Sequence, residues 1–288
     1  MERITHIPQM PARAPDSHKG TYGTGLVLGG STGMAGAAAM CAQAALRSGA
    51  GLIVMGMPHC LLPVMAVKTT CPTLRGFAQT EAGSFAAEAA SEVAGQLAEF
   101  TATALGPGIG RHESTARFVL ELLPQLDIPA VIDADGLNIL SGGLSVLREA
   151  KAPLILTPHP GEMGRLAGIS TKEVQRSRES TAAEFARKHG VTVVLKGHRT
   201  VVTDGARIYT NETGNPGMAT GGAGDVLTGV ILGLLCQGFD PFDAAILGTW
   251  VHGAAGDLAA RKYTEVSMIA TDILECLPEA FRLNQQPQ

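Results

Sequence analysis

Aromatic side chains are scarce in this sequence of 288 residues, where they make up only 4% of the total. Proteins that stack nucleic-acid bases depend on aromatic side chains, and DNA-binding domains carry clustered lysine and arginine. Here 22 basic residues are outnumbered by 26 acidic ones, the net charge is -4, and no basic run occurs. We therefore expect no nucleic-acid partner.

Long apolar runs and paired cysteines are also missing. No stretch of about 18 uninterrupted apolar residues occurs, which argues against a membrane span, and residues 1–10 do not resemble a signal peptide. The five cysteines are scattered and include no C-x-x-C pair. This pattern argues against a disulfide framework or a zinc site, so we expect buried free thiols in a cytoplasmic protein.

Glycine, in contrast, is abundant, with 36 residues in a chain that is 45% hydrophobic. Excess glycine in an apolar chain indicates tight turns and close approach of the backbone to a ligand. The length suits one large α/β domain. Because the sequence shows no linker, internal repeat or low-complexity tract, we expect residues 1–288 to form a single domain.

Short apolar runs alternate with amphipathic, alanine-rich segments at the spacing of β-α-β units. This alternation predicts an α/β fold with a mostly parallel sheet and helices on both faces. The Asp204-Gly205 pair is a hairpin signal, so a small antiparallel pair is expected around it. Strands are predicted at residues 26–28, 52–55, 102–105, 130–132, 154–156, 191–195, 200–203 and 208–210, and helices at 34–48, 84–99, 113–123, 161–166, 172–188, 224–235, 241–261 and 269–281.

Polar or glycine-rich clusters follow directly after five of the predicted strands. In a parallel sheet the carboxyl ends of the strands share one edge, and ligands of open α/β folds bind at that edge. We therefore expect the clusters to line one cleft. They begin at Gly29, Gly106, Asp133, Thr157 and Lys196.

The strongest single motif is Gly-Gly-Ala-Gly-Asp at residues 221–225, which leads into an apolar helix. Backbone amides at such a helix N-terminus can bind an anion, with Asp225 beside them as an acid or base. The alternative is an aspartate that only favours the helix dipole, but the glycine-dense loop favours function. Neither the Walker A nor the G-x-G-x-x-G spacing occurs. The motif predicts a phosphoryl-transfer site.

Each of the other polar residues that follow a predicted strand allows two interpretations. His159, between two prolines, can contact a ligand or only support its loop. Lys196 can neutralise a phosphate or end its strand in solvent. Asp133, Asp135 and Asn138 can hold a metal through water or cap the following turn. The remaining histidines show no metal-ligand spacing, so no transition-metal site is expected.

Together the motifs resemble those of the ADP/ATP-dependent NAD(P)H-hydrate dehydratases, which are repair enzymes with a ribokinase-like fold. The resemblance runs from about Ser17 to the last helices. It is carried by residues 17–23 (SHKGTYG), 29–31 (GGS) with Met34, Gly36 and Ala37, 106–108 (GPG), 133–138 (DADGLN), 156–162 (LTPHPGE), 195–197 (LKG) with Thr200, and 221–225 (GGAGD).

The resemblance implies a repair reaction. Hydrated NADH or NADPH carries a hydroxyl on its nicotinamide ring, and hydroxide is a poor leaving group. Phosphorylation of that hydroxyl by the co-substrate ADP makes phosphate the leaving group, so that NAD(P)H, AMP and phosphate result. Asp225 would take the hydroxyl proton, and the amides of Gly222, Ala223 and Gly224 would stabilise the transferring phosphoryl group. Mg²⁺ would bridge the nucleotide phosphates.

The resemblance also implies two sets of binding residues, none of them assigned as a metal ligand. The hydrated dinucleotide would contact Ala37, Gly108, His159 and Asp225, and the nucleotide would contact Lys196, Gly197, His198, Arg199, Thr200 and Gly224.

Family analogy further implies a homo-oligomer, expected to be a tetramer. Many members carry an N-terminal epimerase domain, whereas only a short segment precedes Ser17 here. The resemblance therefore implies a protein that handles only the S epimer and depends on a separate epimerase for the other one.

Two other functions remain open. A ribokinase-like kinase acting on a small alcohol, such as a thiazole or pyrimidine precursor, would share Asp225 and the anion site. It is not expected to combine the motifs at residues 18–23 and 157–162. A non-enzymatic nucleotide sensor would bind the nucleotide without using Asp225 as a base.

Overall fold

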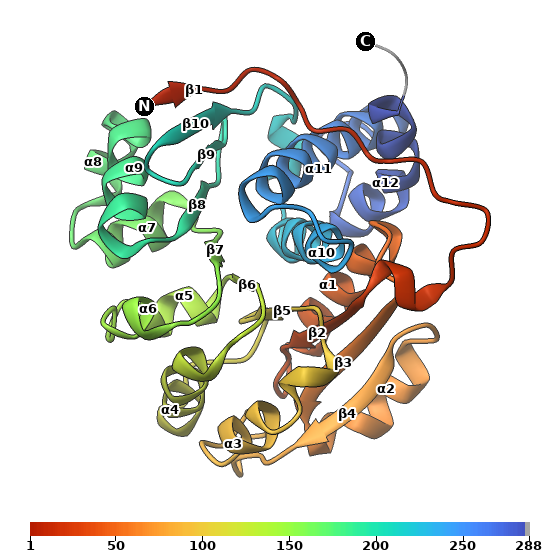
Figure 1. The fold of residues 1–288 in the computed structure, drawn as a ribbon, viewed down its shortest axis with the longest axis vertical. Helices are drawn as coiled ribbons and strands as arrows, with labels where there is room; N and C mark the ends of the chain where they lie inside the picture. Colours follow the sequence, from red (N-terminus) through yellow and green to blue (C-terminus); the bar gives the residue numbers. More distant parts are fainter. Residues whose placement is uncertain (286–288) are drawn as a thin grey trace.

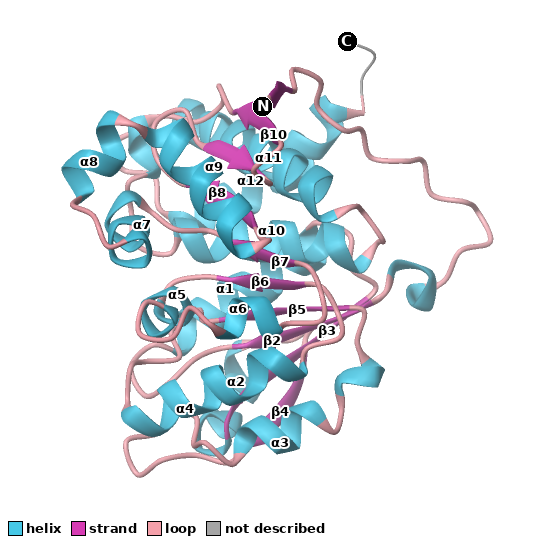
Figure 2. Ribbon diagram, turned by 60° about the vertical axis from the view of Figure 1, so that its left-hand side comes forward, coloured by secondary structure: helices cyan, strands magenta, loops and turns pink. Residues whose placement is uncertain are grey.

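A ten-stranded sheet runs through the molecule, with helices on both of its faces (Figures 1 and 2). The computed structural model describes residues 1–285. The strands lie in the order β1-β10-β9-β8-β7-β6-β5-β2-β3-β4. They are β1 (Glu2–Arg3), β2 (Thr24–Leu28), β3 (Leu52–Pro58), β4 (Thr73–Phe77), β5 (Ala102–Leu105), β6 (Ala130–Ile132), β7 (Leu154–Leu156), β8 (Thr192–Leu195), β9 (Val201–Thr203) and β10 (Arg207–Thr210).

The sheet is mostly parallel, and β9 is the strand that runs against its neighbours. It pairs antiparallel with β10, as the hairpin signal predicted, and also with β8. Asp204 closes the turn, because its Oδ1 accepts hydrogen bonds from the amides of Ala206 and Arg207 at 2.9 and 2.7 Å. The predicted α/β fold with an antiparallel pair is confirmed.

The central strands are buried because helices cover both faces, so they consist mostly of apolar residues. Side chains alternate between the faces: Val27 of β2 packs into one core, and Leu26 and Leu28 pack into the other. The first core is covered by α1 (Ala35–Arg47), α10 (Ala223–Cys236), α11 (Pro241–Tyr263) and α12 (Ala270–Asn284), and the second by α3 (Ala89–Ala94), α4 (Glu113–Leu122), α5 (Asp135–Leu140), α7 (Pro160–Ala167) and α9 (Arg178–His189).

Several predicted elements are wrong or were missed. The helix predicted at 84–99 shrinks to α3 and a short 3-10 turn, because Phe85 instead forms a bridge with Gln79. The helix predicted at 172–188 breaks at Ser177 into α8 (Thr171–Arg176) and α9. Strands β1 and β4, at the sheet edges, and the helices α2 (Leu62–Lys68) and α6 (Val146–Glu149) lack a strong apolar period and were not predicted.

Within residues 1–285 the cysteines are all free, but only some are buried. Cys41 and Cys236 lie in the core, whereas Cys60 and Cys71 are exposed. The expectation of buried thiols is therefore wrong for these last two: Cys60 lies in the 3-10 turn that follows β3, and Cys71 lies in the loop before β4. None of the helices in this described part of the chain is long and apolar enough to cross a membrane.

Candidate functional site

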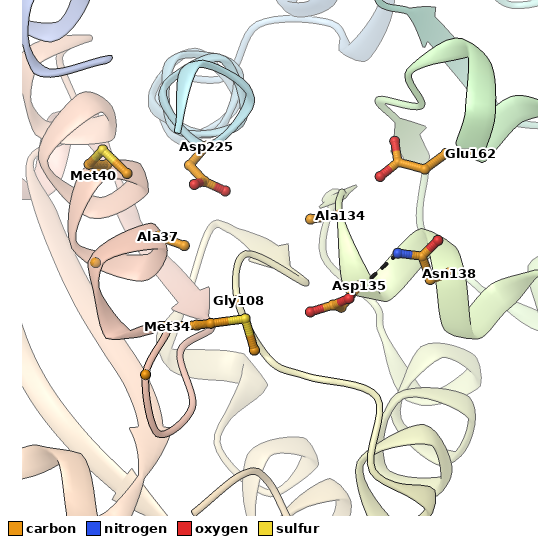
Figure 3. Close-up of a pocket in the computed structure, with 11 residues that line it drawn as sticks. Met34, Ala37, Met40, Gly108, Ala134, Asp135, Asn138, Glu162 and Asp225 are labelled. Carbon is orange, nitrogen blue, oxygen red and sulfur yellow. Dashed lines mark hydrogen bonds between the residues drawn. The ribbon is translucent and has the colours of Figure 1, made fainter. Parts of the chain in front are cut away.

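The candidate site lies where the order of the strands reverses. From β2 the sheet continues to β3 and β4 on one side, and to β5, β6, β7 and β8 on the other. Loops diverge at such a point and leave a crevice. A cavity of about 460 Å³ opens there (Figure 3). Three of the five predicted clusters contribute to its lining, together with the segment that follows the first cluster and with α10. It is lined by Gly33, Met34, Gly36, Ala37, Met40, Gly108, Ala134, Asp135, Asn138, Glu162 and Asp225.

The first turn of α10 forms one wall of this site. Gly222 is the N-cap, with a left-handed φ of 94°, and a Cβ there would lie 2.6 Å from Met40 Cε. The first amides of a helix have no partner within the helix, so those of Gly222 and Gly224 are available to an anion. The amide of Ala223 makes a long bond of 3.4 Å to the Thr220 carbonyl, which an anion would have to displace. Asp225 belongs to the same turn, and its carboxylate points into the cavity (Figure 3).

Asp225 has an environment suited to proton transfer. Its partial burial, followed by the negative charges of Asp133 and Asp135, raises the pKa of its carboxyl to about 7, while Lys196 opposes the rise. A general base works best when its pKa lies near the operating pH, because it is then both ionised and basic. The placement and pKa of Asp225 therefore favour a functional carboxylate over one that only favours the helix dipole.

A buried ion pair lies behind Asp225. Asp133 is 1% exposed, and its Oδ1 accepts a hydrogen bond from Lys196 Nζ at 2.7 Å. Its Oδ2 accepts a second bond of 2.7 Å from Thr228 Oγ1. Burial lowers the pKa of Lys196, but the charges of Asp133 and Glu162 outweigh this and raise it. Lys196 is thus a fixed cation in the site and does not simply end its strand in solvent.

Asp135 and Asn138 connect the cavity wall to its surroundings. Asp135 Oδ2 accepts from the amide of Gly110 at 3.1 Å, and Asn138 Oδ1 accepts from Arg165 Nε at 3.0 Å. The residue that caps α5 is Ala134, whose side chain makes no capping bond. Of the two interpretations, helix capping is therefore not observed for α5, although Asp135 Oδ1 accepts a bond of 3.5 Å from Asn138 Nδ2 within the helix.

His159 begins α7 through reciprocal hydrogen bonds. Its Nδ1 accepts from the amides of Gly161 and Glu162 at 3.0 and 3.3 Å, while Glu162 Oε2 accepts from the His159 amide at 2.8 Å. This is a capping box in which histidine takes the usual place of serine or threonine. Burial, and then Lys196 and Arg165, lower the pKa of His159. At least part of the role of this imidazole is therefore to support its loop.

Glu162 lines the cavity, whereas His159 is not among its lining residues. The side chain of Glu162 is 6% exposed, and burial raises the pKa of its carboxyl. Glu162 belongs to the motif at residues 156–162 but was not among the predicted site residues. The available signal, a glutamate three residues after a helix cap, indicates a capping box and says nothing about the cavity.

The predicted nucleotide loop, residues 196–200, lies at the rim of the site. Gly197 and Arg199 have φ values of 134° and 56°, and Thr200 Oγ1 donates to the Gly197 carbonyl at 3.0 Å. Arg178 of α9 holds the loop from behind, donating to the carbonyls of Leu195 and Lys196. Residues 197–199 are exposed, so Lys196 alone reaches the buried cluster.

Two of the predicted nucleotide contacts adjoin one another in space. A Cβ on Gly224 would lie 3.2 Å from Lys196 Nζ, although the two residues are 28 positions apart in the sequence. Of the four predicted dinucleotide contacts, Ala37, Gly108 and Asp225 line the cavity.

The motif at residues 17–23 lies away from the cavity. It precedes β2 and therefore stands at the amino edge of the parallel strands, opposite the site. Its 3-10 turn packs tightly on the start of β3, since a Cβ on Gly51 would lie 1.8 Å from the Lys19 carbonyl oxygen. This motif therefore contributes to the packing at the amino edge of the sheet.

The donors around the cavity fit a hard cation such as Mg²⁺. Among residues 1–285, no three His, Cys, Asp or Glu side chains form a cluster that would hold a metal alone. The cavity is nevertheless lined by the carboxylates of Asp135, Glu162 and Asp225. Mg²⁺ is usually held by one or two carboxylates together with substrate phosphates, so these residues fit that kind of site.

Sequence comparisons with known proteins all indicate the same family. The profile of a protein family described as NAD(P)H-hydrate dehydratase matches residues 25–279. A bifunctional NAD(P)H-hydrate repair enzyme from Moorella thermoacetica is 46% identical over 95% of this chain, which spans 52% of that relative. The chain thus spans about half the length of the bifunctional relatives. An ADP-dependent (S)-NAD(P)H-hydrate dehydratase from Neisseria meningitidis is 40% identical, over 89% of this chain and 83% of that protein.

Comparison with solved structures supports the same family and fold. The ADP/ATP-dependent NAD(P)H-hydrate dehydratase from Bacillus subtilis, co-crystallised with ATP and Mg²⁺, is 34% identical and superposes with a TM-score of 0.82, over 96% of this chain and 95% of that one. A ribokinase-like superfamily protein from Enterococcus faecalis, 25% identical, superposes with a TM-score of 0.83 over 99% and 97% of the two chains.

Proposed function

Because the chain belongs to the NAD(P)H-hydrate dehydratase family, we propose that it dehydrates the S epimer of NADH hydrate and NADPH hydrate at the expense of ADP. The observation that carries the proposal is Asp225. Its carboxyl, with a pKa of about 7, points into the cavity from the first turn of α10, beside Lys196. A carboxylate, the first amides of a helix and a cation around one point support the proposal.

In the proposed reaction the ring hydroxyl attacks the terminal phosphorus of ADP while Asp225 takes the hydroxyl proton. The bond from that phosphorus to the bridging oxygen breaks and AMP leaves. Lys196 and the amides of residues 222–224 stabilise the charge on the transferring group. The new phosphate ester then eliminates phosphate with loss of a ring proton, which restores the double bond of NAD(P)H.

Ala37 and Gly108 line the side of the cavity where the hydrated dinucleotide would lie. Residues 197–200 and Gly224 would hold the nucleotide. Mg²⁺, when bound, would neutralise the phosphates, with Asp135 or Glu162 as its protein ligand. A cytoplasmic homotetramer and a functional link to an epimerase belong to the same proposal, and light scattering tests the tetramer.

The test is to incubate the protein with acid-treated NADH and with ADP and Mg²⁺, and to follow absorbance at 340 nm. We expect recovery of absorbance with release of one AMP and one phosphate per NADH. A small-molecule kinase would keep phosphate on its product, and a nucleotide sensor would bind ADP without turnover. If neither ADP nor ATP supports recovery, the proposed function is wrong.

A further inference from the structure

Thr228, which the sequence analysis did not single out, makes an unusual bond for a helical threonine. It is completely buried in α10, one turn after Gly224. Threonine hydroxyls inside helices commonly bond to the carbonyl four residues earlier, as Thr249 does with Ala245 at 2.7 Å in α11. Thr228 instead donates to Asp133 Oδ2, at the end of β6, at 2.7 Å.

This bond completes a network across three elements. Asp133, after β6, uses one carboxylate oxygen for Lys196, after β8, and the other for Thr228 of α10. The first turn of α10 packs closely against this ion pair, because a Cβ on Gly224 would lie 3.2 Å from Lys196 Nζ and 3.6 Å from Asp133 Oδ2. A small shift of α10 along its axis would therefore break the bond and separate Gly224 from the ammonium group.

We propose that Thr228 is a positioning residue, whose hydroxyl docks α10 on Asp133 and thereby holds the amides of residues 222–224 and the Asp225 carboxylate in register with Lys196. Thr228 does not line the cavity, so it acts through Asp133 and through the helix. The inference rests on the proposed function, since the register matters only if Asp225 and Lys196 act on the same phosphoryl group.

The geometry predicts an effect on turnover more than on binding. Misplacement of reacting groups by about 1 Å can lower a rate about 100-fold. Thr228→Val keeps the shape of the side chain but leaves Asp133 Oδ2 buried without its donor. We expect kcat to fall about 10- to 100-fold, with KM for ADP and for NADH hydrate changed less than about threefold. Thr228→Ser, which keeps the hydroxyl, should restore most of the turnover.

Thr249→Val is the matched control, because Thr249 is also buried in a helix but its hydroxyl bonds only within its own helix. It should keep kcat per folded molecule, even where its melting temperature falls as far as that of Thr228→Val. Turnover of Thr228→Val within about twofold of the wild type, or Thr228→Ser as impaired as Thr228→Val, overturns the inference.

The experiment also distinguishes a variant that does not fold from a failure of the proposed function. If Thr228→Val does not fold, Thr228→Cys replaces it, since a thiol is a weaker donor of similar size. Turnover of the cysteine variant below that of the serine variant then supports the inference, and equal turnover overturns it. Absence of wild-type activity on NADH hydrate and ADP would refute the proposed function itself, whereas an active wild type with an unimpaired Thr228→Val refutes only the role of Thr228.

Discussion

Glycines stand on both sides of the cavity: Gly222 and Gly224 in the first turn of α10 are crowded, whereas Gly33 and Gly36 beside the start of α1 are not. A Cβ on Gly222 would lie 2.6 Å from Met40 Cε, and one on Gly224 would lie 3.2 Å from Lys196 Nζ. A Cβ on Gly36, in the first turn of α1, would meet no atom within 4 Å. The α10 side is therefore filled by the protein and fixed in place, while the α1 side leaves space that a substrate can occupy.

The largest expected effect is that of Asp225→Asn, on the fixed side. Asparagine keeps the shape of the side chain but cannot accept the hydroxyl proton, so we expect kcat to fall about 1,000-fold or more. ADP affinity, measured by calorimetry, should stay within about threefold, because the amides of the α10 turn and Lys196 are unchanged. Turnover within tenfold of the wild type would show that Asp225 is not the base.

Gly224→Ala should have the next largest effect. The added Cβ would press on Lys196 Nζ and displace the ammonium group from the α10 turn. We expect kcat to fall about 10- to 100-fold, because groups that act together lose their alignment. Steady-state kinetics checks this, and circular dichroism verifies that the variant is folded. Wild-type kcat in a folded variant would mean that the crowding has no part in turnover.

Sequence alone predicted the sheet and the edge that carries the site, because buried parallel strands are short apolar runs with polar loops after them. It did not predict which glycines are crowded. Crowding depends on side chains from distant segments: Lys196 reaches Asp133 across 63 positions, and Thr228 reaches it across 95. Periodicity and local motifs carry no information about such pairs.

The lack of information about distant contacts also explains why the sequence did not predict the roles of some other residues. Asp133 stands in a turn, where a carboxylate commonly caps a helix, yet its two oxygens are taken by Lys196 and Thr228. Phe85 lies in a segment with helical spacing, yet it packs in the core beside Phe118 and forms a bridge with Gln79. In both cases tertiary contacts outweigh the local preference.

A smaller effect is expected from pH. A base must be ionised, and the pKa of the Asp225 carboxyl is about 7. Turnover should therefore rise with pH, level off above 7, and fall about tenfold for each pH unit below it. Asp135→Asn removes a negative charge that raises this pKa, so the rise in kcat should move to lower pH. A kcat profile from about pH 5 to 9 checks both, and a shift to higher pH would contradict the electrostatic account.

Gly36→Ala should have the smallest effect, and it tests the open side. Alanine is a better helix former than glycine, so the free energy of unfolding should rise by at most about 1 kcal/mol. The new methyl group would project into space that we assign to the substrate, so KM for NADH hydrate should rise about two- to fivefold with kcat unchanged. Gln43→Ala, on the exposed face of the same helix, is the control and should leave KM unchanged. If Gly36→Ala stabilises the protein without raising KM, the open space is not where the hydrated ring binds, and the contrast between the two groups of glycines reflects packing alone.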